Sequence, residues 1–592
     1  MRRVPPEAPD GVAGGQRGSG LQTTNKPGRR GRPTRRPTPL NYVLPGLLAA
    51  AAVVAVVAVV AWAPAARAQT PPVATTAATT AGTTAVTTVQ VQGFEVQGNS
   101  LLSADTLAQR LLEFKGLSTL QRLRDAAAAV QELYRRAGYG GVVAFLPEQA
   151  LHDGVLRIRV VEGKLTRVDV ADNKQFSAAN IRASLPTLVT GRTPDVRRID
   201  AEIQLANENP AKTVQVLLQP GAEPGSIAAK VSVTEQPVQR FTARLDNTGS
   251  ERTGRWRAAL GWQHANVFDK DHVFGAELQT APEHPSSVAV LSGNYRAPLY
   301  GPALAIDAYG AYSDVDAGKV GTPAGDLQFS GKGYVAGLRG SAYLPRYLNI
   351  DQRLVLGLEW RQYLNNCAIA GLPQGACGAA GASVSVQPVS LTYTAQTVSD
   401  IRYGFSVGLH HNLGLGGSHG AAADFDAVRK GSTRGYTLLR GSGQVAVPVQ
   451  GWGVLAARLQ GQYSHQPLVP GELFGIGGAQ SVRGFEEREL GGDSGAQMSV
   501  EVISPAAAEW LPALAGYDLR GLLFADAGYV AKRQGDPCNA GRSHCKLGAL
   551  GAGLRMNWQQ LQLRLDAARA MNAGATTQKG DTRVHLALAY NF

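Results

Sequence analysis

The sequence of 592 residues predicts a transmembrane β-barrel of antiparallel strands that follows two small α+β modules. Three observations favour this fold class. From Gln239 onward, about sixteen segments of roughly ten residues alternate apolar and polar side chains, as strands do that cross a bilayer with one face on lipid. Glycine accounts for 70 of the 592 residues, nearly double its usual share of about 7%. Charged residues make up only 17% of the chain, against about 25% in ordinary soluble domains. Residues 89–236 repeat one order of elements twice.

The first 68 residues are expected to form a signal peptide with an extended basic region. Residues 1–40 are basic and rich in Pro and Gly, Leu44–Ala63 is almost entirely apolar, and Ala66-Arg67-Ala68 offers the small residues that signal peptidase reads before Gln69. An inner-membrane anchor is the alternative, since about 20 apolar residues can span a bilayer. The long basic region indicates either a start codon assigned too far upstream or a signal that slows export.

The positive charge of the chain belongs mainly to this leader. The full chain has a net charge of +13, whereas the chain without residues 1–68 has 48 basic and 43 acidic side chains, a net charge of +5. Composition therefore gives no support to nucleic-acid binding. Residues 69–88 are rich in Thr, Ala and Pro, and we expect a flexible linker because they have too few apolar side chains to form a core.

Residues 89–163 and 164–236 are expected to be two copies of one module with the order strand, helix, helix, strand, strand. In the first copy the elements are Val89–Val96, Ala104–Leu112, a helix opened by the capping pattern Ser118-x-x-Gln121 and closed by Gly138, Val142–Phe145 and Val155–Val161. In the second copy they are Thr166–Val170, Ala178–Ser184, Asp195–Asn207, Thr213–Gln219 and Ile227–Thr234.

Residues 237–592 are expected to form the barrel. The alternation is clearest in the last segments, where Leu561, Leu563 and Leu565 are separated by polar side chains. Connections alternate between tight turns and long loops, as expected for short periplasmic turns and long external loops. The tight turns include 298–302, 345–349 and 450–453, and the long loops include 367–385, 413–433 and 467–493. A soluble β-sandwich or propeller is the alternative.

The four cysteines form two close pairs in long loops, Cys367 with Cys377 and Cys538 with Cys545. Two local disulfides outside the cell are the expectation for an exported protein. The spacing of the cysteines is not that of a zinc site, and no histidine stands at a zinc-ligand spacing from the pairs. We therefore expect no metal.

No motif indicates an enzyme or a cofactor. Gly416-Gly417-Ser418-His419-Gly420 matches the G-x-S-x-G nucleophile pattern, but it lies in a Gly-rich loop and not at a strand-turn-helix elbow. His410 and His411 are neighbours on a strand and point to opposite faces, so they cannot bind one metal. The sequence has neither a zinc-protease motif nor a phosphate-binding loop.

One constellation links the long loop 467–493 to a later strand. The loop carries Val482-Arg483-Gly484-Phe485, and the strand carries Phe524-x-Asp526-x-Gly528. Asp526 shares the lumen face of its strand with Phe524, so a buried carboxylate there needs a partner, and an arginine offers a bidentate fork. The alternative is that Arg483 is an exposed loop cation and Asp526 a solvated acid.

These features resemble the outer-membrane assembly and translocation superfamily, and within it the two-partner secretion transporters (the TpsB family, of the ShlB/FhaC/HecB hemolysin secretion and activation type). The resemblance covers about residues 85–592 and rests on the two motifs above, the tandem modules and the terminal Phe592. At the start of the barrel, Asp246-Asn247-Thr248-Gly249 is also similar to this branch.

The resemblance implies that the modules are POTRA domains and that the barrel has sixteen strands. It implies an inward lid loop with Arg483 at its tip and Asp526 as its partner on the barrel wall. Tyr590 and Phe592 then belong to a C-terminal assembly signal. Many relatives begin with a helix that plugs the pore, but residues 69–88 lack the apolar stripe of such a helix.

The implied function is transport of an unfolded exoprotein from the periplasm to the surface of a Gram-negative cell. The cargo would be a hemolysin-, adhesin- or hemagglutinin-like partner with an N-terminal secretion domain, captured by the POTRA domains. Further expected partners are outer-membrane lipid and lipopolysaccharide, with the barrel assembly machinery and periplasmic chaperones during biogenesis; nucleic acid is not expected. The alternatives are an assembly factor that inserts other barrels into the outer membrane and a passive porin.

Overall fold

In the computed structural model, the described residues are 88–150, 153–251, 253–285, 288–314, 318–322, 325–329, 332–364, 382–397, 399, 401–533, 538 and 541–592. The expected signal peptide, the linker apart from Thr88, and the pair Cys367 and Cys377 lie outside these residues. Among the helices of the described part, none is both long and apolar enough to cross a membrane.

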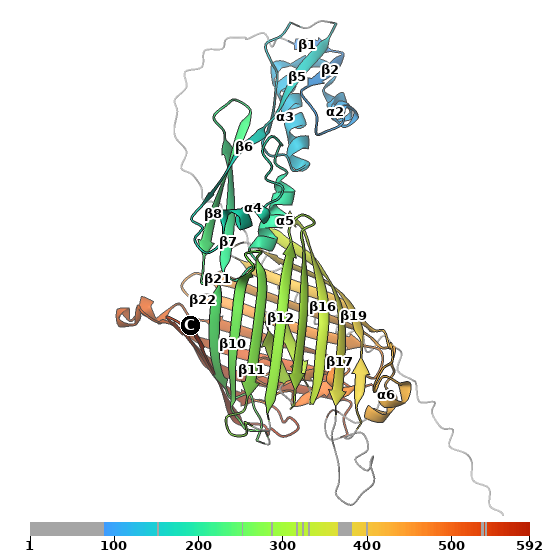
Figure 1. The fold of residues 1–592 in the computed structure, drawn as a ribbon, viewed down its shortest axis with the longest axis vertical. Coiled ribbons are helices and arrows are strands. Elements are labelled where there is room, and N and C mark those ends of the chain that lie inside the picture. Colours follow the sequence, from blue (N-terminus) through green and yellow to red (C-terminus); the bar gives the residue numbers. More distant parts are fainter. Residues whose placement is uncertain are drawn as a thin grey trace, which may run out of the picture. The chain divides into compact units, whose positions relative to one another are not determined.

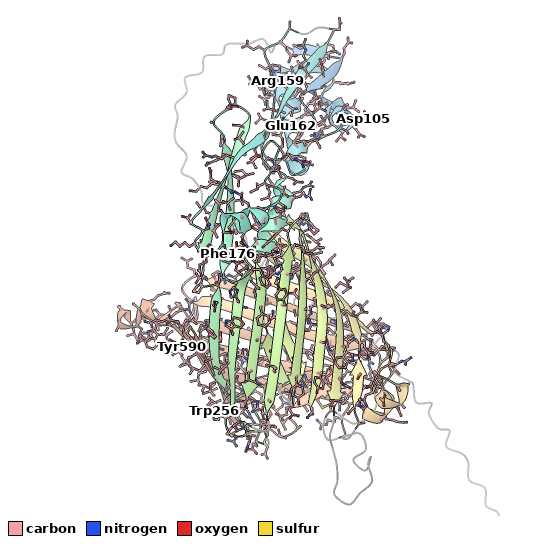
Figure 2. The ribbon with its side chains drawn as sticks, viewed as in Figure 1. Asp105, Arg159, Glu162, Phe176, Trp256 and Tyr590 are labelled. Atoms are coloured by element: carbon pink, nitrogen blue, oxygen red, sulfur yellow. A yellow bond between two sulfur atoms is a disulfide. The ribbon has the colours of Figure 1, made fainter. Side chains whose placement is uncertain are left out.

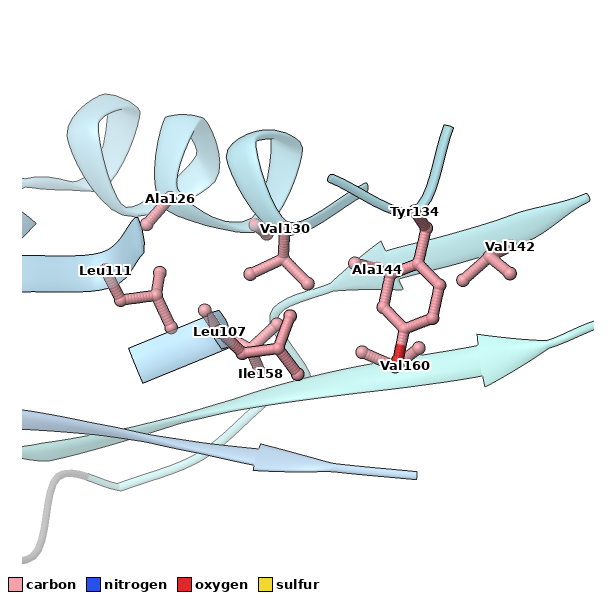
Figure 3. Packing of buried hydrophobic residues seen from close by; sticks show 10 residues of the cluster. Leu107, Leu111, Ala126, Val130, Tyr134, Val142, Ala144, Ile158 and Val160 are labelled. Atoms are coloured by element: carbon pink, nitrogen blue, oxygen red, sulfur yellow. The ribbon is translucent and has the colours of Figure 1, made fainter. Parts of the chain in front are cut away.

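The first module packs two helices on a three-stranded sheet (Figures 1 and 3). Its elements are β1 (Thr88–Val91), β2 (Gly93–Gln97), α2 (Ala104–Leu111), the 3-10 turn η1 (Leu112–Phe114), β3 (Gly116–Thr119), α3 (Leu120–Arg136), β4 (Val142–Phe145) and β5 (Val155–Glu162). In the sheet β2 is parallel to β5, and β4 is antiparallel to β5. Val130 and Tyr134 of α3 are fully buried in the core with Leu107 and Ile158.

Two local expectations for this module are wrong. The stretch Val89–Val96 is interrupted at Gln92, because β1 pairs with β3 whereas β2 pairs with β5. Helix α3 is capped by Thr119, whose hydroxyl accepts a hydrogen bond from the Arg122 amide at 3.3 Å. Ser118 is buried in β3, so its hydroxyl turns back to the preceding carbonyls and does not cap the helix.

The second module repeats the arrangement on its own core. Its elements are β6 (Lys164–Ala171), α4 (Ala178–Ala183), α5 (Val196–Ala206), β7 (Lys212–Pro220) and β8 (Ser226–Glu235), with the sheet order β6-β8-β7. Asp195 caps α5 by accepting a hydrogen bond from the Arg197 amide at 3.0 Å. Phe176, Val214 and Val231 are buried beneath the helices.

The rest of the described chain forms a closed antiparallel barrel of sixteen strands. The strands are β9 (Gln239–Asp246), β10 (Arg257–Val267), β11 (His272–Thr280), β12 (Ala289–Leu299), β13 (Leu304–Ser313), β16 (Lys332–Tyr347), β17 (Ile350–Leu364), β18 (Val384–Val386) with β19 (Pro388–Thr397), β20 (Arg402–Asn412), β21 (Thr437–Val449), β22 (Gly453–Ser464), β25 (Ser494–Ile503), β26 (Asp518–Ala531), β27 (His544–Trp558), β28 (Leu561–Ala570) and β29 (Thr582–Asn591). β18 and β19 both pair with β17 and make one strand, interrupted at Gln387. Alternation sets the two faces: Leu522 is 5% exposed toward the lumen, whereas Leu523 is 66% exposed on the outer face.

Connections differ at the two ends of the barrel. β9 follows the second module directly, so we call the end where it begins the module end, and the opposite end the far end. At the module end, six connections have two to four residues, and the connection 504–517 has fourteen. At the far end lie helix α6 (Ala422–Val428; Figure 1), the hairpin of β14 (Gly318–Thr322) and β15 (Gly325–Phe329), and the long loop between β22 and β25.

Lys212 joins the second module to the barrel through a buried ion pair. Its ammonium group lies 2.5 Å from Asp271 Oδ2, and neither side chain is more than 1% exposed. Tyr300 donates a hydrogen bond to the same carboxylate oxygen. Burial lowers the pKa of Lys212, and Asp271 opposes this change. Loss of one partner would leave the other charge buried and unpaired, which costs about 3–5 kcal/mol of stability. The pair therefore holds the module against the turn between β10 and β11.

Candidate functional site

The loop 467–493, the lid loop, folds into the lumen from the far end. It contains the 3-10 turn η3 (Pro470–Glu472) and the short hairpin of β23 (Phe474–Ile476) with β24 (Leu490–Gly492). Ile476, Val482 and Phe485 are fully buried and pack against Val530 and Leu547 of the wall. The apolar side of the lid therefore covers the wall made by β26 and β27.

Glycines permit this close approach of lid and wall. Gly484 has a φ of +90°, and a Cβ there would lie 3.2 Å from the Ala568 carbonyl oxygen. On the wall, a Cβ at Gly528 would lie 2.9 Å from Val482 and 3.0 Å from Ile476. Gly484 thus leaves room for the wall, and Gly528 leaves room for the lid. This role of the two glycines cannot be inferred from the sequence motifs alone.

Arg483 at the lid tip meets Asp526 in a bidentate pair. Arg483 Nε lies 2.7 Å from Asp526 Oδ2, and Nη2 lies 2.8 Å from Oδ1, while the Arg483 amide donates to Oδ2 at 3.1 Å. Both side chains are fully buried. The guanidinium carbon lies 3.3 Å from the centre of the Phe524 ring, which adds a cation–π contact. The two predicted motifs therefore form one contact, with Val482, Gly484 and Gly528 shaping its surroundings.

The wall around Arg483 supplies more polar groups than the sequence analysis identified. Ser499 accepts a hydrogen bond from Arg483 Nη2 at 3.0 Å, and Glu501 lies 2.8 Å from Nη1. Asp566 of β28 lies 3.7 Å from Nη1, and His585 of β29 accepts a hydrogen bond from the Gly484 amide at 3.1 Å. Alternation already places Ser499 and Glu501 on one face, but only the barrel register brings that face to Asp526.

A second buried contact holds the opposite limb of the lid. Glu472 of η3 is 2% exposed and lies 2.8 Å from Arg361 of β17 and 3.2 Å from Arg440 of β21. Tyr363 donates to it at 2.9 Å. Burial by itself would raise the pKa of Glu472, but Arg361 and Arg440 bring it below the ordinary value. The lid is therefore fixed to two different parts of the lumen wall.

A third contact closes the base of the lid at the far end. Arg429, next to α6, forms a bidentate pair with Asp493 at 2.6 and 2.9 Å. The amides of Leu468 and Arg533 donate to the same carboxylate at 2.7 and 2.8 Å. Asp493 thus ties both ends of the lid loop to the neighbouring loops.

Two cavities lie along one side of the lumen, and the second of them is lined in part by the lid. A cavity of about 530 Å³ opens at the module end, and one of about 310 Å³ lies beside the lid. Both are lined by Ser406, Ser442 and Gln460, from β20, β21 and β22. We call this shared polar strip the corridor; charged side chains of the same cavities, such as Arg458 and Arg440, flank it, and Glu472 meets Arg440 at its lid end.

The Asp246-Asn247-Thr248-Gly249 motif lies where the barrel closes. β9 and β29 pair over Thr242–Asp246 and Ala587–Asn591. Asn247 extends this seam, since its side-chain oxygen accepts from the Leu586 amide and its side-chain nitrogen donates to the Val584 carbonyl, both at 2.8 Å. Gly249 has no room for a side chain, because a Cβ would lie 2.1 Å from the Gly254 carbonyl oxygen. Asp246 accepts a hydrogen bond from the Thr248 amide at 3.0 Å.

The chain end secures the other end of the seam. Phe592 stacks on Phe241 with ring centres 5.6 Å apart, and the two residues exchange backbone hydrogen bonds. Tyr590 stacks on Phe592.

At the far end, Cys538 and Cys545 form a disulfide, with Cys545 already inside β27. In the Gly-rich loop, the backbone carbonyl of Ser418 accepts a hydrogen bond from the Ser385 hydroxyl.

Comparisons with known proteins agree on one group. A family profile described as haemolysin secretion/activation protein ShlB/FhaC/HecB matches residues 225–556, and one described as POTRA domain, ShlB-type matches residues 89–163. The outer membrane transporter CdiB of Escherichia coli O6:K15:H31 is 26% identical over 437 residues, 70% of this chain and 68% of the relative. The heme/hemopexin transporter protein HuxB of Haemophilus influenzae is 24% identical over 29% of this chain and 31% of the relative.

Solved structures share the fold. CdiB from Escherichia coli superposes with a TM-score of 0.70 at 19% identity, over 88% of this chain and 93% of that one. CdiB from Acinetobacter baumannii gives 0.65 at 17% identity, over 85% and 90%.

Proposed function

The chain belongs to the ShlB/FhaC/HecB family of haemolysin secretion/activation proteins, and on that premise we propose that its POTRA domains capture an unfolded exoprotein that then passes along the corridor to the cell surface. The family consists of outer-membrane transporters of two-partner secretion, so this chain is a transporter with a secreted protein as its partner. It resides in the outer membrane, with the POTRA domains in the periplasm. The module end of the barrel is thus periplasmic and the far end external. Membership of this transporter family favours secretion over insertion of other barrels.

The observation that carries the route is the asymmetric attachment of the lid. Arg483 and the apolar side of the lid lie on the wall from β25 to β29. The corridor follows β20 to β22, where Ser406, Ser442 and Gln460 line both cavities and charged side chains flank them. An extended chain passing there meets hydroxyl and amide groups, which exchange hydrogen bonds with any peptide backbone. The clasp of Glu472 with Arg361 and Arg440 is what closes this route at the lid.

Capture is proposed to occur at the open edges of the POTRA sheets. β4 is an edge strand of the first domain, and its Val143 and Phe145 are 51% and 40% exposed. β7 is an edge strand of the second, with Leu217 60% exposed. An extended cargo segment can add a strand to such an edge through backbone hydrogen bonds, while the apolar side chains select its sequence.

Direction is proposed to come from folding of the cargo outside the cell, because the periplasm offers no nucleotide. The remaining partners are also proposals. The lipid-facing side chains suit outer-membrane lipid and lipopolysaccharide. Tyr590 and Phe592 at the chain end suit recognition by the barrel assembly machinery and its chaperones before the seam closes.

Co-expression with a candidate exoprotein tests this function. The candidate is a large exported protein with an N-terminal secretion domain, expressed in cells that lack both proteins. We expect the exoprotein in the medium with the full chain, and in the periplasm with a chain lacking residues 89–234. Secretion by the truncated barrel would overturn capture by the POTRA domains.

A further inference from the structure

The periplasmic connection 504–517 between β25 and β26 is unlike the other connections at that end. It has fourteen residues where the others have two to four, and it is built from two 3-10 turns, η4 (Ala507–Glu509) and η5 (Pro512–Leu514). Glu509 is its one charged residue; the remainder is Ala, Pro, Leu, Trp and Tyr with one Ser and one Gly. A long loop of this composition in water would ordinarily bury its apolar side chains, and we call it the apolar foot.

The foot instead exposes its largest apolar groups. Trp510 is 63% exposed and Leu511 is 59% exposed. The two turns give these side chains a fixed backbone, because the amides of Trp510 and Leu511 both bond to the Ala507 carbonyl, at 3.1 and 2.8 Å. The orange segment that projects beside the C-terminus in Figure 1 is this region of the chain.

The foot is continuous with a surface that already meets lipid. Tyr517, its last residue, lies with its ring 5.5 Å from that of Trp558, at the periplasmic end of β27. Trp558 is 40% exposed, and Trp452 in the neighbouring turn between β21 and β22 is 74% exposed. Aromatic side chains at the end of a barrel mark the boundary between hydrocarbon and headgroups. The exposed side chains of the foot therefore start at the level of that boundary.

We propose that the apolar foot lies in the periplasmic leaflet of the outer membrane, with Trp510 and Leu511 inserted among the lipids and Glu509 at the headgroups. Trp suits this position because its ring is apolar and its N–H seeks a polar partner. The occupant of the surface is lipid, since the apolar faces on both sides of the foot are lipid faces. Insertion of the foot fixes the depth of β25 and β26 in the membrane. These strands carry Ser499, Glu501 and Asp526.

Depth-dependent quenching in vesicles tests the proposal on the whole barrel. A thiol-reactive NBD fluorophore is placed at Ala513→Cys, which leaves Trp510 and Leu511 intact, and the protein is reconstituted in phosphatidylcholine vesicles under non-reducing conditions. Leu523→Cys on the lipid face is the hydrocarbon control, and Asp105→Cys on the POTRA domain (Figure 2) is the aqueous control. The unsubstituted chain gives the labelling background, and heat-modifiable migration confirms folding.

We expect NBD at position 513 to emit at shorter wavelength than at 105 and to be quenched severalfold more by a nitroxide near the headgroups than by one deep in the chains. Leu523→Cys should show the reverse preference. Replacing Trp510 and Leu511 with Glu in the Ala513→Cys chain should return the emission to that of position 105. Emission at 513 equal to that at 105 would overturn the proposal, and so would a blue shift that depends on protein dilution and not on lipid quencher, because a second copy would then cover the foot.

Discussion

Removing Asp526 is expected to release the lid tip without unfolding the barrel. Asp526→Ala takes away three hydrogen bonds to Arg483, at 2.7, 2.8 and 3.1 Å, and leaves a fully buried guanidinium. Breaking a buried pair costs about 3–5 kcal/mol. Glu501 still lies 2.8 Å from Arg483 Nη1, so we place the effect at the low end. Since about 1.4 kcal/mol is a factor of ten, the ratio of pinned to released lid should fall roughly a hundredfold.

Secretion of the exoprotein is the assay, with heat-modifiable migration as the control for assembly. Arg483→Ala and Asp526→Ala should each cut secretion while the barrel still assembles, because Arg483 lies in the lid and replacing the Asp526 side chain leaves the backbone ladders of β26 in place. Arg483→Lys should rescue poorly, since an ammonium group cannot make the bidentate fork. The double variant should be no worse than the worse single variant, because both lose the same contact. Strictly additive effects would refute the reasoning.

Three other predictions concern separate parts of the molecule. Glu472→Gln should raise ion conductance in planar bilayers, because Arg361 and Arg440 lose the carboxylate that they share. Unchanged conductance would show that this contact does not close the pore. In the first POTRA domain, hydrogen bonds from Ser100, from the Leu101 amide and from Tyr134 outweigh burial and lower the pKa of Glu162. These hydrogen bonds contribute their full stability above the unfolded-state pKa of Glu162, and the contribution is lost as pH falls through the folded-state pKa. Hydrogen-exchange protection at the Leu101 amide should therefore drop in acid. The same drop in a Glu162→Gln chain would contradict this explanation. Reduction of the Cys538–Cys545 disulfide should leave the barrel heat-modifiable, since backbone ladders close the barrel independently; loss of that behaviour would show the bond to be structural.

The sequence was sufficient for the fold class because period-2 alternation survives in each barrel strand, and Leu522 and Leu523 lie on the faces that it predicts. Residue pattern alone left open whether Arg483 and Asp526 are paired or solvated, and the family resemblance supplied their pairing. The sequence was insufficient for Glu501, Asp566 and His585, because their meeting depends on barrel register and not on local pattern. Glu472 was missed for the same reason, as its partners are on β17 and β21, far from it in the chain.

Two details of the first domain show why local signals misled. Ser118-x-x-Gln121 matches a capping box, but the strand pairing of β3 with β1 turns the Ser118 side chain into the interior. Val89–Val96 is predicted as one alternating strand, but its apolar residues change face between Val91 and Phe94, where the amide of Gln92 bonds to the Gly154 carbonyl at 2.8 Å. Tertiary pairing decided both cases.

Cross-linking from the corridor tests the central claim most directly. A photo-reactive residue replaces Ser442, which faces the corridor, or Leu439 on the same strand, which is 44% exposed on the lipid face. The exoprotein is stalled during export by a folded domain fused to its trailing end. The account predicts an adduct between cargo and barrel from Ser442 and none from Leu439. Adducts from Leu439 alone, or none from Ser442 in cells that secrete the unstalled cargo, would contradict passage along the β20–β22 wall.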